Sequence, residues 1–417
     1  MSTSPISRVR GTEDLLDLRL HNFVLDCVKK HLQRYNFSEI QTPILEHTNL
    51  FVHSLGTETD VVAKEMYTFN TSSGESICLR PEATASTIRA YFENRIEQAP
   101  WKVFTYGPMF RHERPQKGRW RQFSQMSIEV IASDSIAQDA HFIKMLDTLY
   151  SDILKLENYV VKLNFLGCSD DRKEHKQALL SFLETVTEKI CSTCITRKEK
   201  NTLRIFDCKN EADKETYTKA PKLVDHLCRP CNKEWQQLMS MLTMLSVSYV
   251  IDPTLVRGLD YYNKTVFEFS SRELGAQNAF CGGGRYNLGK EVGAKDNFPS
   301  IGVGIGMGRL LLLVENVQSK LIIPQEPALS VIIPFSDDQH QLALLLATDL
   351  QNNNICADIL VEGASLSSMM KKANKMGAKY ALLLGPDEQT NGTVAIKNMQ
   401  TGASETIKQA EAVKFLK

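Results

Sequence analysis

The sequence predicts an α/β protein of the mixed α+β kind, in which a largely antiparallel sheet precedes a small α/β domain. Apolar and polar residues alternate, as in half-buried strands, over 101–110, 124–132, 262–270 and 301–308. These stretches lack the strand–helix rhythm of a dinucleotide-binding fold. A charged, lysine-rich and helical stretch interrupts them, and regular alternation of strands with helices begins only near residue 327.

The chain is long enough for more than one domain. Its 417 residues are 42% hydrophobic, which suffices for two or three packed cores. We expect a first domain over 1–325 that contains an insertion at 168–246, and a second domain over 327–417. Pro324 and Pro327 mark the linker between them.

An amphipathic helix followed by a strand is expected near the start of the first domain. Between residues 18 and 35, apolar residues recur at helical spacing and give one apolar face. The following stretch from residue 38 is expected to form a strand that ends at Pro43. Because proline has no N–H to donate, this strand belongs at a sheet edge or an interface.

The second domain is expected to alternate strands and helices. Apolar runs predict strands, and amphipathic stretches between them predict helices. The expected strands lie at 329–335, 355–361 and 380–385, and the expected helices at 339–350 and 367–375.

Charge and composition exclude several classes of protein. The 49 basic and 49 acidic residues cancel, which argues against a general nucleic-acid coating protein, because such proteins are strongly basic. The sequence has no run of eighteen apolar residues and no signal peptide, so we expect a cytoplasmic protein without membrane segments. Its ten cysteines are then expected to be reduced thiols, buried side chains or metal ligands.

Residues 110–125 gather five cations and one acid. Arginine presents a planar fork of donors that matches phosphate oxygens in pairs, which suits a triphosphate. Glu113 would accept a hydrogen bond from an adenine amino group or a ribose hydroxyl, and Phe123 would stack on the base. The alternative is a solvated β-hairpin whose turn is marked by Pro115 and Gly118. The candidate phosphate ligands are Arg111, Arg114, Arg119 and Arg121.

A second candidate site follows from alternating glycines. Four glycines between residues 302 and 308 leave one face of an extended strand bare, where a flat ligand can lie. Arg309 comes next, at the start of an expected buried helix whose N-terminus favours anionic oxygens. The alternative is close backbone packing against another strand. GxGxGxG spacing excludes a Rossmann site, and Glu291 in GRYNLGKE excludes a phosphate loop, which has Ser or Thr there.

Five segments resemble motifs of one enzyme family. RHERPQKGRWRQF (111–123) resembles the second signature motif of class II aminoacyl-tRNA synthetases, in its histidyl-tRNA synthetase form. The glycine run with Arg309 resembles the third motif, and the helix, strand and Pro43 resemble the first, which builds the family's homodimer interface. LVRGLDYYNKTVFE (255–268) and FCGGGRYN (280–287) resemble two signatures of histidyl-tRNA synthetases.

This resemblance implies a fold and a role for each domain. The family has a six-stranded antiparallel sheet flanked by helices, so 1–325 is expected to be catalytic, with 168–246 as a helical insertion. The domain at 327–417 is expected to bind the tRNA anticodon. Three lysines would add cationic charge there, unless they only form a solvated helix face: Lys371, Lys375 and Lys379.

The resemblance also assigns roles around ATP. Arg111 and Arg257 would face each other across the α-phosphate, whereas an isolated arginine such as Arg257 is otherwise expected to be a surface cation. Arg309 would hold the γ-phosphate. The implied catalytic residues are Arg111, Arg257 and Arg309, and the implied ATP-binding residues are Arg111, Glu113, Arg119, Phe123 and Arg309.

A second set of residues would bind histidine. LRPEATAS (79–86) resembles the segment that binds the amino group, although Pro81 and Glu82 also suit a plain helix start. Gln125 and Glu129 lie on one face of a strand. Adjacent tyrosines on a strand otherwise point to opposite faces. The implied histidine-binding residues are Glu82, Ala83, Thr84, Arg111, Gln125, Glu129, Arg257, Tyr261 and Tyr262.

The implied function is that of a bacterial-type histidine–tRNA ligase, which uses ATP with Mg²⁺, L-histidine and tRNA(His) and acts as a homodimer. The alternatives are a catalytically inactive, histidine-binding regulatory paralogue of the ATP phosphoribosyltransferase type and a stress-sensing tRNA-binding module. Intact Arg257 and Arg309 argue against the first. The chain departs from residues frequent in the family, beside rather than at motif positions, at Ala83, Ser124, Asn287 and Gly308.

Four cysteines form two CxxC pairs separated by 33 intervening residues: Cys191 and Cys194, then Cys228 and Cys231. Together they have the chemistry of one tetrahedral Zn²⁺ site, although their separation exceeds the usual spacing. The alternative is a set of buried thiols.

Overall fold

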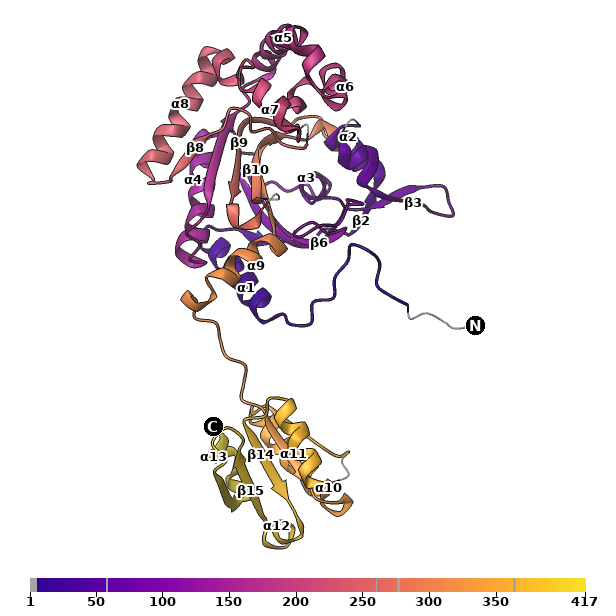
Figure 1. Cartoon of the computed structure of the whole chain (residues 1–417), viewed down its shortest axis with the longest axis vertical. Coiled ribbons are helices and arrows are strands. Elements are labelled where there is room, and N and C mark those ends of the chain that lie inside the picture. The colour runs from indigo at the N-terminus through magenta and orange to yellow at the C-terminus, as the bar shows by residue number, and fades with distance from the viewer. Residues whose placement is uncertain (1–5, 58, 260, 276–277, 363–364) are drawn as a thin grey trace. The chain divides into compact units, whose positions relative to one another are not determined.

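The computed structural model describes residues 6–57, 59–259, 261–275, 278–362 and 365–417. The chain divides into two compact units, Met1–Ile323 and Pro324–Lys417, drawn from indigo to yellow along the chain in Figure 1. The larger unit contains the elements on which the predicted site residues lie.

An eight-stranded sheet forms the centre of the larger unit, in the order β1-β5-β6-β11-β10-β9-β7-β8. Its six inner strands are antiparallel to their neighbours, whereas β1 and β8 pair in parallel at the edges. The predicted count of six is therefore correct for the antiparallel core and too low for the sheet. The strand expected from residue 38 to Pro43 lies at a sheet edge, as β1, but it ends at Glu39, and β8 has three residues, too few to show a pattern. The strands are β1 (Ser38–Glu39), β5 (Trp101–Phe110), β6 (Gln122–Ile131), β7 (Val160–Phe165), β8 (Tyr249–Ile251), β9 (Tyr262–Ser270), β10 (Ala279–Asn287) and β11 (Pro299–Gly306).

Helices pack on one face of this sheet and form the main apolar core. On β11, Ile301, Val303 and Ile305 point into that core, so the glycines between them face the other way. Figure 1 shows α4 and α8 side by side along the sheet, where they are in contact. The helices of this face are α1 (Arg19–Arg34), α4 (Ile136–Thr148), α8 (Arg229–Met244) and α9 (Met307–Asn316).

The opposite face of the sheet is covered by a smaller layer. Helix α3 packs its apolar residues Ile88 and Tyr91 against Ile131 of β6 and Tyr286 of β10. A three-stranded sheet in the order β2-β4-β3 lies beside this helix. The elements of this layer are β2 (Leu45–His47), α2 (Thr48–Leu55), β3 (Tyr67–Asn70), β4 (Ser76–Leu79) and α3 (Thr84–Glu93).

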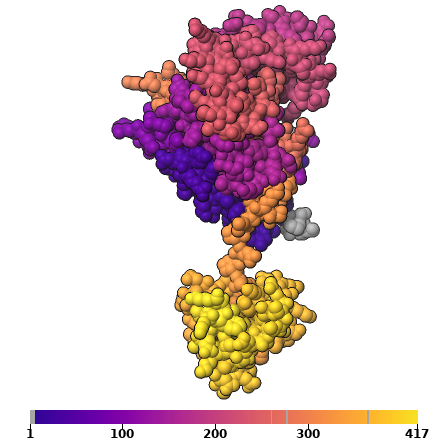
Figure 2. Space-filling view, turned by 90° about the vertical axis from the view of Figure 1, so that its left-hand side faces the viewer, coloured from indigo at the N-terminus to yellow at the C-terminus, as the bar shows by residue number. Residues whose placement is uncertain are grey.

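Between β7 and β8 the chain forms a helical segment with its own small apolar core. That core contains Leu179, Leu183, Ile205 and the thiols of Cys194 and Cys208. Figure 2 shows the helical segment between β7 and β8, in magenta to salmon, as a continuous mass at one end of the larger unit. Its helices before α8 are α5 (Ser169–Val186), α6 (Ser192–Lys200) and α7 (Glu211–Tyr217).

The C-terminal unit is a five-stranded mixed sheet in the order β13-β12-β14-β15-β16, with helices packed on it. Its first half follows the expected alternation, whereas β15 and β16 form an antiparallel hairpin that the expectation lacked. Among the described residues, no helix has the length and hydropathy to cross a membrane. The elements are β12 (Ser330–Pro334), α10 (His340–Asn352), β13 (Ala357–Ile359), α11 (Leu366–Lys375), β14 (Tyr380–Leu384), α12 (Pro386–Asn391), β15 (Thr393–Asn398), β16 (Ser404–Lys408) and α13 (Ala412–Leu416).

Candidate active site

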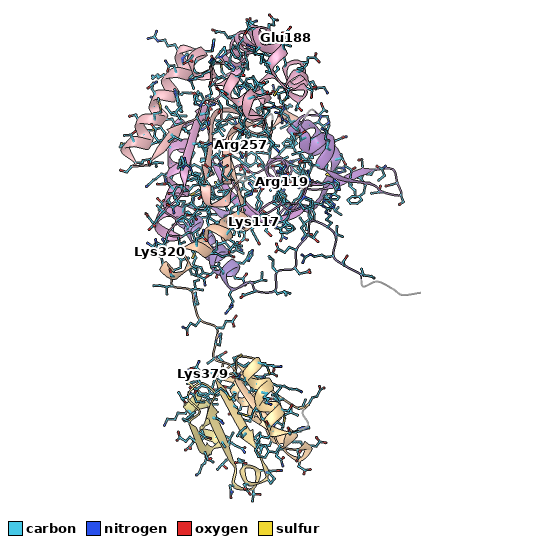
Figure 3. The ribbon with its side chains drawn as sticks, viewed as in Figure 1. Lys117, Arg119, Glu188, Arg257, Lys320 and Lys379 are labelled. Atoms are coloured by element: carbon cyan, nitrogen blue, oxygen red, sulfur yellow. The ribbon has the colours of Figure 1, made fainter. Side chains whose placement is uncertain are left out.

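A cavity of about 220 Å³ lies on the glycine-bearing face of the large sheet. Segments far apart in the sequence meet there: the start of α3, the β5–β6 hairpin, the segment before β9, and the strands β10 and β11. Figure 3 labels Arg119 and Arg257, which line it from two of these segments. The predicted site residues in its lining are Glu82, Thr84, Arg111, Glu113, Arg119, Phe123, Gln125, Arg257, Tyr261, Tyr262 and Arg309.

Two arginines in the wall are held by backbone carbonyls. Arg111 donates from Nε to the carbonyl oxygen of Pro81 at 2.9 Å, and its guanidinium lies 5.5 Å from the ring centre of Phe123. Arg309 donates from Nε to the carbonyl oxygen of Gly118 at 2.8 Å and from Nη1 to that of Ala279 at 2.6 Å. A carbonyl carries no full charge, so these hydrogen bonds position the two guanidiniums without themselves neutralising them.

Arg257 is held by an ion pair and by a glycine. Its Nη1 lies 2.9 Å from the Glu268 carboxylate on β9. A Cβ added at Gly282 would lie 2.4 to 2.6 Å from the guanidinium of Arg257, so only glycine leaves room for this side chain. The surface position otherwise expected for an isolated arginine is therefore wrong for Arg257.

Glu113 and Arg119 form an ion pair with each other across the hairpin loop. A second carboxylate, that of Glu65, lies 3.9 Å from Arg119. Of the four arginines predicted to hold phosphates in this loop, only Arg111 and Arg119 line the cavity. Arg114 is exposed, whereas Arg121 packs beside Gly11 and Pro115 and donates to the carbonyl oxygen of Glu113.

Two buried carboxylates lie at the α3 end of the cavity. Glu82 accepts hydrogen bonds from the backbone N–H groups of Thr84 and Ala85 at 2.7 and 2.9 Å. Glu129 accepts hydrogen bonds from the hydroxyls of Thr84 and Tyr286, both at 2.7 Å. Burial raises the pKa of both groups, that of Glu129 to about 8. Among the described residues, no cation donates a hydrogen bond to either carboxylate, so this end of the cavity favours a positively charged ligand.

The glycines of β11 make room for the side chains of Glu129 and Gln125 on the paired strand β6. In the register of the sheet, Gly302 lies opposite Glu129 and Gly306 opposite Gln125. A Cβ on Gly302 would lie 1.6 Å from the Glu129 carboxylate, and one on Gly304 would lie 3.1 Å from the Gln125 amide. The bare strand face therefore accommodates two side chains of β6, while Gly304, Gly306 and Gly308 also line the cavity.

The two adjacent tyrosines line the same cavity, with ring centres 4.6 Å apart. Tyr262 is the first residue of β9 and Tyr261 precedes it, so the strict alternation of a strand does not apply. The expectation of one core ring and one surface ring is therefore wrong. Burial also raises the pKa of both hydroxyls, which consequently stay protonated and able to donate.

This combination of cations, buried acids and glycines accompanies a family match over most of the chain. The protein-family model described as histidyl-tRNA synthetase matches residues 22–310, and the family model described as anticodon binding domain matches residues 330–417. The chain belongs to the histidyl-tRNA synthetase family. It is 41% identical to the histidine–tRNA ligase of Halothermothrix orenii over 97% of each chain, and 38% identical to that of Clostridioides difficile over 98% of each. The apo crystal structure of S. aureus histidyl-tRNA synthetase has 32% identity and a TM-score of 0.80, covering 99% of this chain and 100% of that one.

Two residues predicted to bind histidine in this synthetase-family site do not line the cavity among the described residues. Ala83 is fully buried as the N-cap residue of α3, where it positions the helix start rather than facing a ligand. Glu129 is only 1% exposed and lies behind Thr84 and Gly302. Its contact with Thr84 nevertheless connects it to the cavity wall.

Sequence reasoning missed the partners that hold the site in place. Glu268 pairs with Arg257, and Tyr286 donates to Glu129. Both lie within the two histidyl-tRNA synthetase signatures, so their place in those strings was the available signal. Their contacts depend on the pairing of β10 with β9 and β11 and of β11 with β6, which the sequence pattern does not specify.

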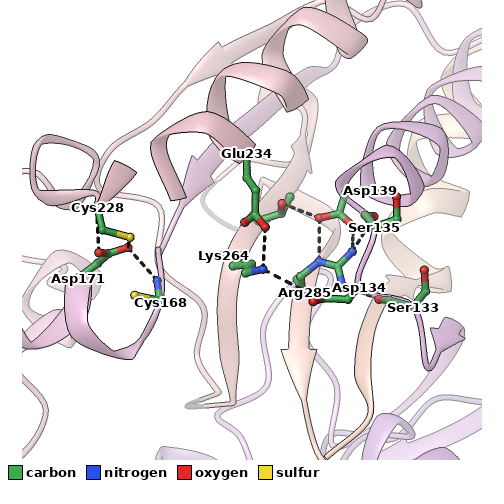
Figure 4. A network of polar contacts seen from close by, with 11 residues as sticks. Ser133, Asp134, Ser135, Asp139, Cys168, Asp171, Cys228, Glu234, Lys264 and Arg285 are labelled. Carbon is green, nitrogen blue, oxygen red and sulfur yellow. Dashed lines mark hydrogen bonds and ion pairs between the residues drawn. The ribbon is translucent and has the colours of Figure 1, made fainter. Parts of the chain in front are cut away.

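A buried ion pair fixes β10 behind the site. Arg285, only 1% exposed, pairs with Asp139 of α4 and donates to the carbonyl oxygens of Ser133 and Ser135 at 2.6 and 2.9 Å. Figure 4 shows this network beside the pair of Lys264 with Glu234. Arg285 therefore lies in a strand with a structural partner, which agrees with the exclusion of a phosphate loop over this segment.

The cysteine pairs do not form the single site suggested by their sequence. Instead, the structure contains two groups whose possible ligand atoms all lie within 4.8 Å of one another. The outer cluster is Cys168, Asp171, Cys228 and Cys231, and the inner cluster is Cys191, Cys194, Cys208 and Asp213. The prediction of one shared site is wrong because each CxxC pair has its own further candidate ligands elsewhere in the chain. These are Cys168 and Asp171 for one pair, and Cys208 and Asp213 for the other.

Proposed function

We propose that this protein is a histidine–tRNA ligase that first converts histidine and ATP to histidyl-adenylate and pyrophosphate. The observation that carries this proposal is the cavity itself, where Arg111 and Arg257 stand beside the buried acid Glu82, with the second buried acid, Glu129, behind Thr84. Anionic phosphates suit the first pair, and the α-ammonium of an amino acid suits the second. The family match names the reaction that needs both ligands together.

In the activation step, an oxygen of the histidine carboxylate attacks the α-phosphorus of ATP. The new O–P bond forms as the bond to the bridging oxygen breaks, and pyrophosphate leaves with that electron pair. Arg111 and Arg257 stabilise the charge that grows on the α-phosphate oxygens. Because their contacts to Pro81 and Glu268 hold them before substrate arrives, little reorganisation is needed in the transition state.

The adenine and the two outer phosphates of ATP contact the β5–β6 hairpin loop and Arg309. Phe123, already stacked on Arg111, and the carboxylate of Glu113 hold adenine, while Arg119 and Arg309 neutralise the departing pyrophosphate. In the structure Glu113 and Arg119 are paired. ATP binding must therefore exchange that pair for contacts of Glu113 with the base and of Arg119 with phosphate.

Histidine occupies the α3 end of the cavity. Glu82 and Thr84 receive the α-ammonium, and Gln125 with the two tyrosines, Tyr261 and Tyr262, contacts the imidazole from the cavity wall. Glu129 acts through Thr84 and accepts from the ligand only if side chains shift, because it is almost fully buried. Hydrogen bonds that an analogue cannot form give discrimination of roughly 10⁴ to 10⁵ without editing.

Mg²⁺ is expected to arrive with ATP. The described carboxylates in the cavity wall are those of Glu82 and Glu113, and both are engaged, by backbone N–H groups and by Arg119. Protein-bound Mg²⁺ typically keeps water and phosphate oxygens as ligands. We therefore assign the ion to the phosphates, where it adds to the charge compensation by the arginines.

In the second step a ribose hydroxyl at the 3′ end of tRNA(His) attacks the adenylate, so catalysis depends on positioning. We assign activation to residues 1–325, which include the insertion 168–246, and anticodon binding to 327–417. The family model over 330–417 supports the second assignment. Three exposed lysines near α11 supply phosphate contacts: Lys371, Lys375 and Lys379.

The active form is a homodimer in the cytoplasm. Next to Pro43, the apolar side chains of Ile44 and Leu45 are 39% and 53% exposed, and Phe69 in the same small sheet is 48% exposed. Burial of these side chains against a second copy removes apolar area from water. Sedimentation of the purified chain tests the dimer.

Amino-acid-dependent exchange of pyrophosphate into ATP tests the function, with each of the twenty amino acids. Exchange that requires histidine, followed by transfer to tRNA(His), is the expected result. A folded protein that binds histidine but exchanges no pyrophosphate is instead the inactive regulatory paralogue, and the proposed function is then wrong.

A further inference from the structure

The inner and outer clusters of the insertion share one architecture. In each, a CxxC pair begins a helix: Cys191 is the N-cap residue of α6, and Cys228 is the N-cap residue of α8. The second cysteine of each pair, Cys194 or Cys231, follows in the first turn. The N–H groups and the positive end of the dipole at a helix N-terminus favour thiolate there.

Each cluster also contains an aspartate in the first turn of another helix. Asp171 of α5 accepts from the backbone N–H groups of Cys168 and Cys228 at 3.0 and 2.9 Å, as Figure 4 shows. Asp213 of α7 accepts from the backbone N–H of Cys191 at 3.0 Å. A carboxylate has about four lone-pair sites, so these bonds leave oxygen lone pairs for a metal ion.

A third cysteine completes each cluster, Cys168 in the outer one and Cys208 in the inner one. Cys208 lies in the inner cluster, with its sulfur 3.8 Å from that of Cys191 and 3.3 Å from the Asp213 carboxylate. Two thiolates on one tetrahedral Zn²⁺ with Zn–S bonds of about 2.3 Å lie about 3.8 Å apart. The Asn210 N–H also points at the Cys208 sulfur at 3.4 Å, as it would to support a thiolate.

Charge gives a second reason for a cation. Three thiolates beside a carboxylate would repel one another without a cation. A dication compensates their charge, and the thiols release protons as it binds.

We propose that each cluster binds one zinc ion through three thiolates and one carboxylate oxygen, so that the insertion holds two structural zinc sites. Sulfur-rich tetrahedral ligand sets suit Zn²⁺, whereas Mg²⁺ and Ca²⁺ prefer oxygen. With four protein ligands, neither ion has an open position for substrate, which is typical of a structural site.

The two ions would have different effects on the fold. The outer cluster joins the chain where it leaves β7 to the chain where it enters α8, and thus closes the insertion at its base. The inner cluster links α6 and α7 beside the small core of Leu179, Leu183 and Ile205. A core of this size gains folding free energy from a metal that binds only the folded state.

Metal content of the full chain, purified without chelators and freed of loose metal by gel filtration, tests the proposal. The expected result is about two zinc ions per chain. Exchange with Co²⁺ should give the sulfur-to-cobalt charge-transfer absorption of tetrahedral thiolate sites. Because this measurement uses the wild-type chain, it does not depend on whether any variant folds.

Variants then assign each ion. Cys194→Ser or Asp213→Asn should lose the inner ion and Cys231→Ser the outer ion, each leaving about one zinc per chain. Matched controls are Cys27→Ser in α1 and Cys356→Ser in the C-terminal unit, which should keep both ions.

Three results would overturn the proposal. Wild-type protein that retains no zinc after growth in its presence, with its cysteines freely reactive toward a thiol reagent, contradicts both sites. Iron at the same stoichiometry contradicts the assignment of zinc. Disulfides within the clusters, seen as lost mass in the unreduced chain, contradict thiolate ligation, and would need the 3.8 Å sulfur separation to shrink to about 2.05 Å.

Discussion

The two ends of the cavity hold their charges in opposite ways. At the end that we propose binds phosphates, Arg257 and Arg119 are paired with the carboxylates of Glu268 and Glu113. At the end that we propose binds histidine, Glu82 and Glu129 receive hydrogen bonds only from uncharged donors among the described residues. Paired arginines stay charged and in place before ATP arrives. A buried carboxylate without a cation instead holds its proton more tightly, so the histidine end becomes fully charged only when a cationic ligand enters.

The largest expected effect comes from the phosphate end. Arg257→Ala removes a preorganised donor to the α-phosphate, so kcat for pyrophosphate exchange should fall about 10²- to 10³-fold, or about 3 kcal/mol. Single-turnover adenylate formation measures the step directly. The exposed Arg272→Ala is the control and should keep the wild-type rate. An unchanged adenylation rate in Arg257→Ala would contradict its place at the α-phosphate.

A smaller effect is expected from the wall of the histidine end. Gly302→Ala places a Cβ against the Glu129 carboxylate, and relief of that overlap should cost about 1 to 3 kcal/mol. The KM for histidine should rise more than the KM for ATP, because the displaced network of Glu129 and Thr84 is remote from the phosphates.

A second substitution tests the cause. Glu129→Ala in the Gly302→Ala background removes the colliding carboxylate, so the two effects should be less than additive. Simple additivity would show that Gly302→Ala acts through some other contact.

The ion pair of the hairpin loop should have a more modest effect. Glu113→Gln removes the charge that holds Arg119 and weakens the acceptor for adenine, so we expect the KM for ATP to rise about tenfold, or about 1.4 kcal/mol. The KM for histidine should stay near wild type. Equal rises in both constants would show that Glu113 supports the whole cavity rather than the adenine end.

A separate effect, on stability rather than on activity, concerns pH. The pKa of Glu129 is raised to about 8, so between an unfolded value of about 4.3 and that pKa the native state binds more protons than the unfolded state. Stability from this group is therefore lost as pH rises through the window, by at most about 1.4 kcal/mol per pH unit. In thermal unfolding, the stability of Glu129→Gln relative to wild type should therefore be higher at pH 8 than at pH 6.

The exposed Glu97→Gln serves as the control and should follow wild type at both pH values. A gap between Glu129→Gln and wild type that stays constant with pH would show that Glu129 is charged in the native state throughout.

The sequence predicts the long helices and strands of this molecule better than the contacts that its segments make with one another. Helix α1 and the long strands β5, β6, β9 and β11 have clear periodicity, and each forms where expected. The edge strand β8 carries too few residues for a pattern, and β1 begins where expected but ends at Glu39, before the expected end at Pro43.

Within the site, same-face placement of Gln125 and Glu129 follows from strand alternation alone and is confirmed by the register with β11. The contact of Arg257 with Glu268 depends instead on a side chain crossing Gly282. In the cysteine clusters, Cys168 and Asp171 join a CxxC pair that lies more than fifty residues further along the chain. Local spacing carries no signal for such contacts, so sequence reasoning grouped the wrong pairs.

One feature of the insertion bears on how this chain can be altered. The two oxygens of Asp171 accept from the backbone N–H of Cys168 and that of Cys228, so the part of the insertion before α8 begins and ends at nearly one point. A segment with adjacent ends behaves as an interchangeable module. Its length and sequence can drift over evolution, or be replaced by a short engineered turn, while β7 and α8 keep their places in the fold.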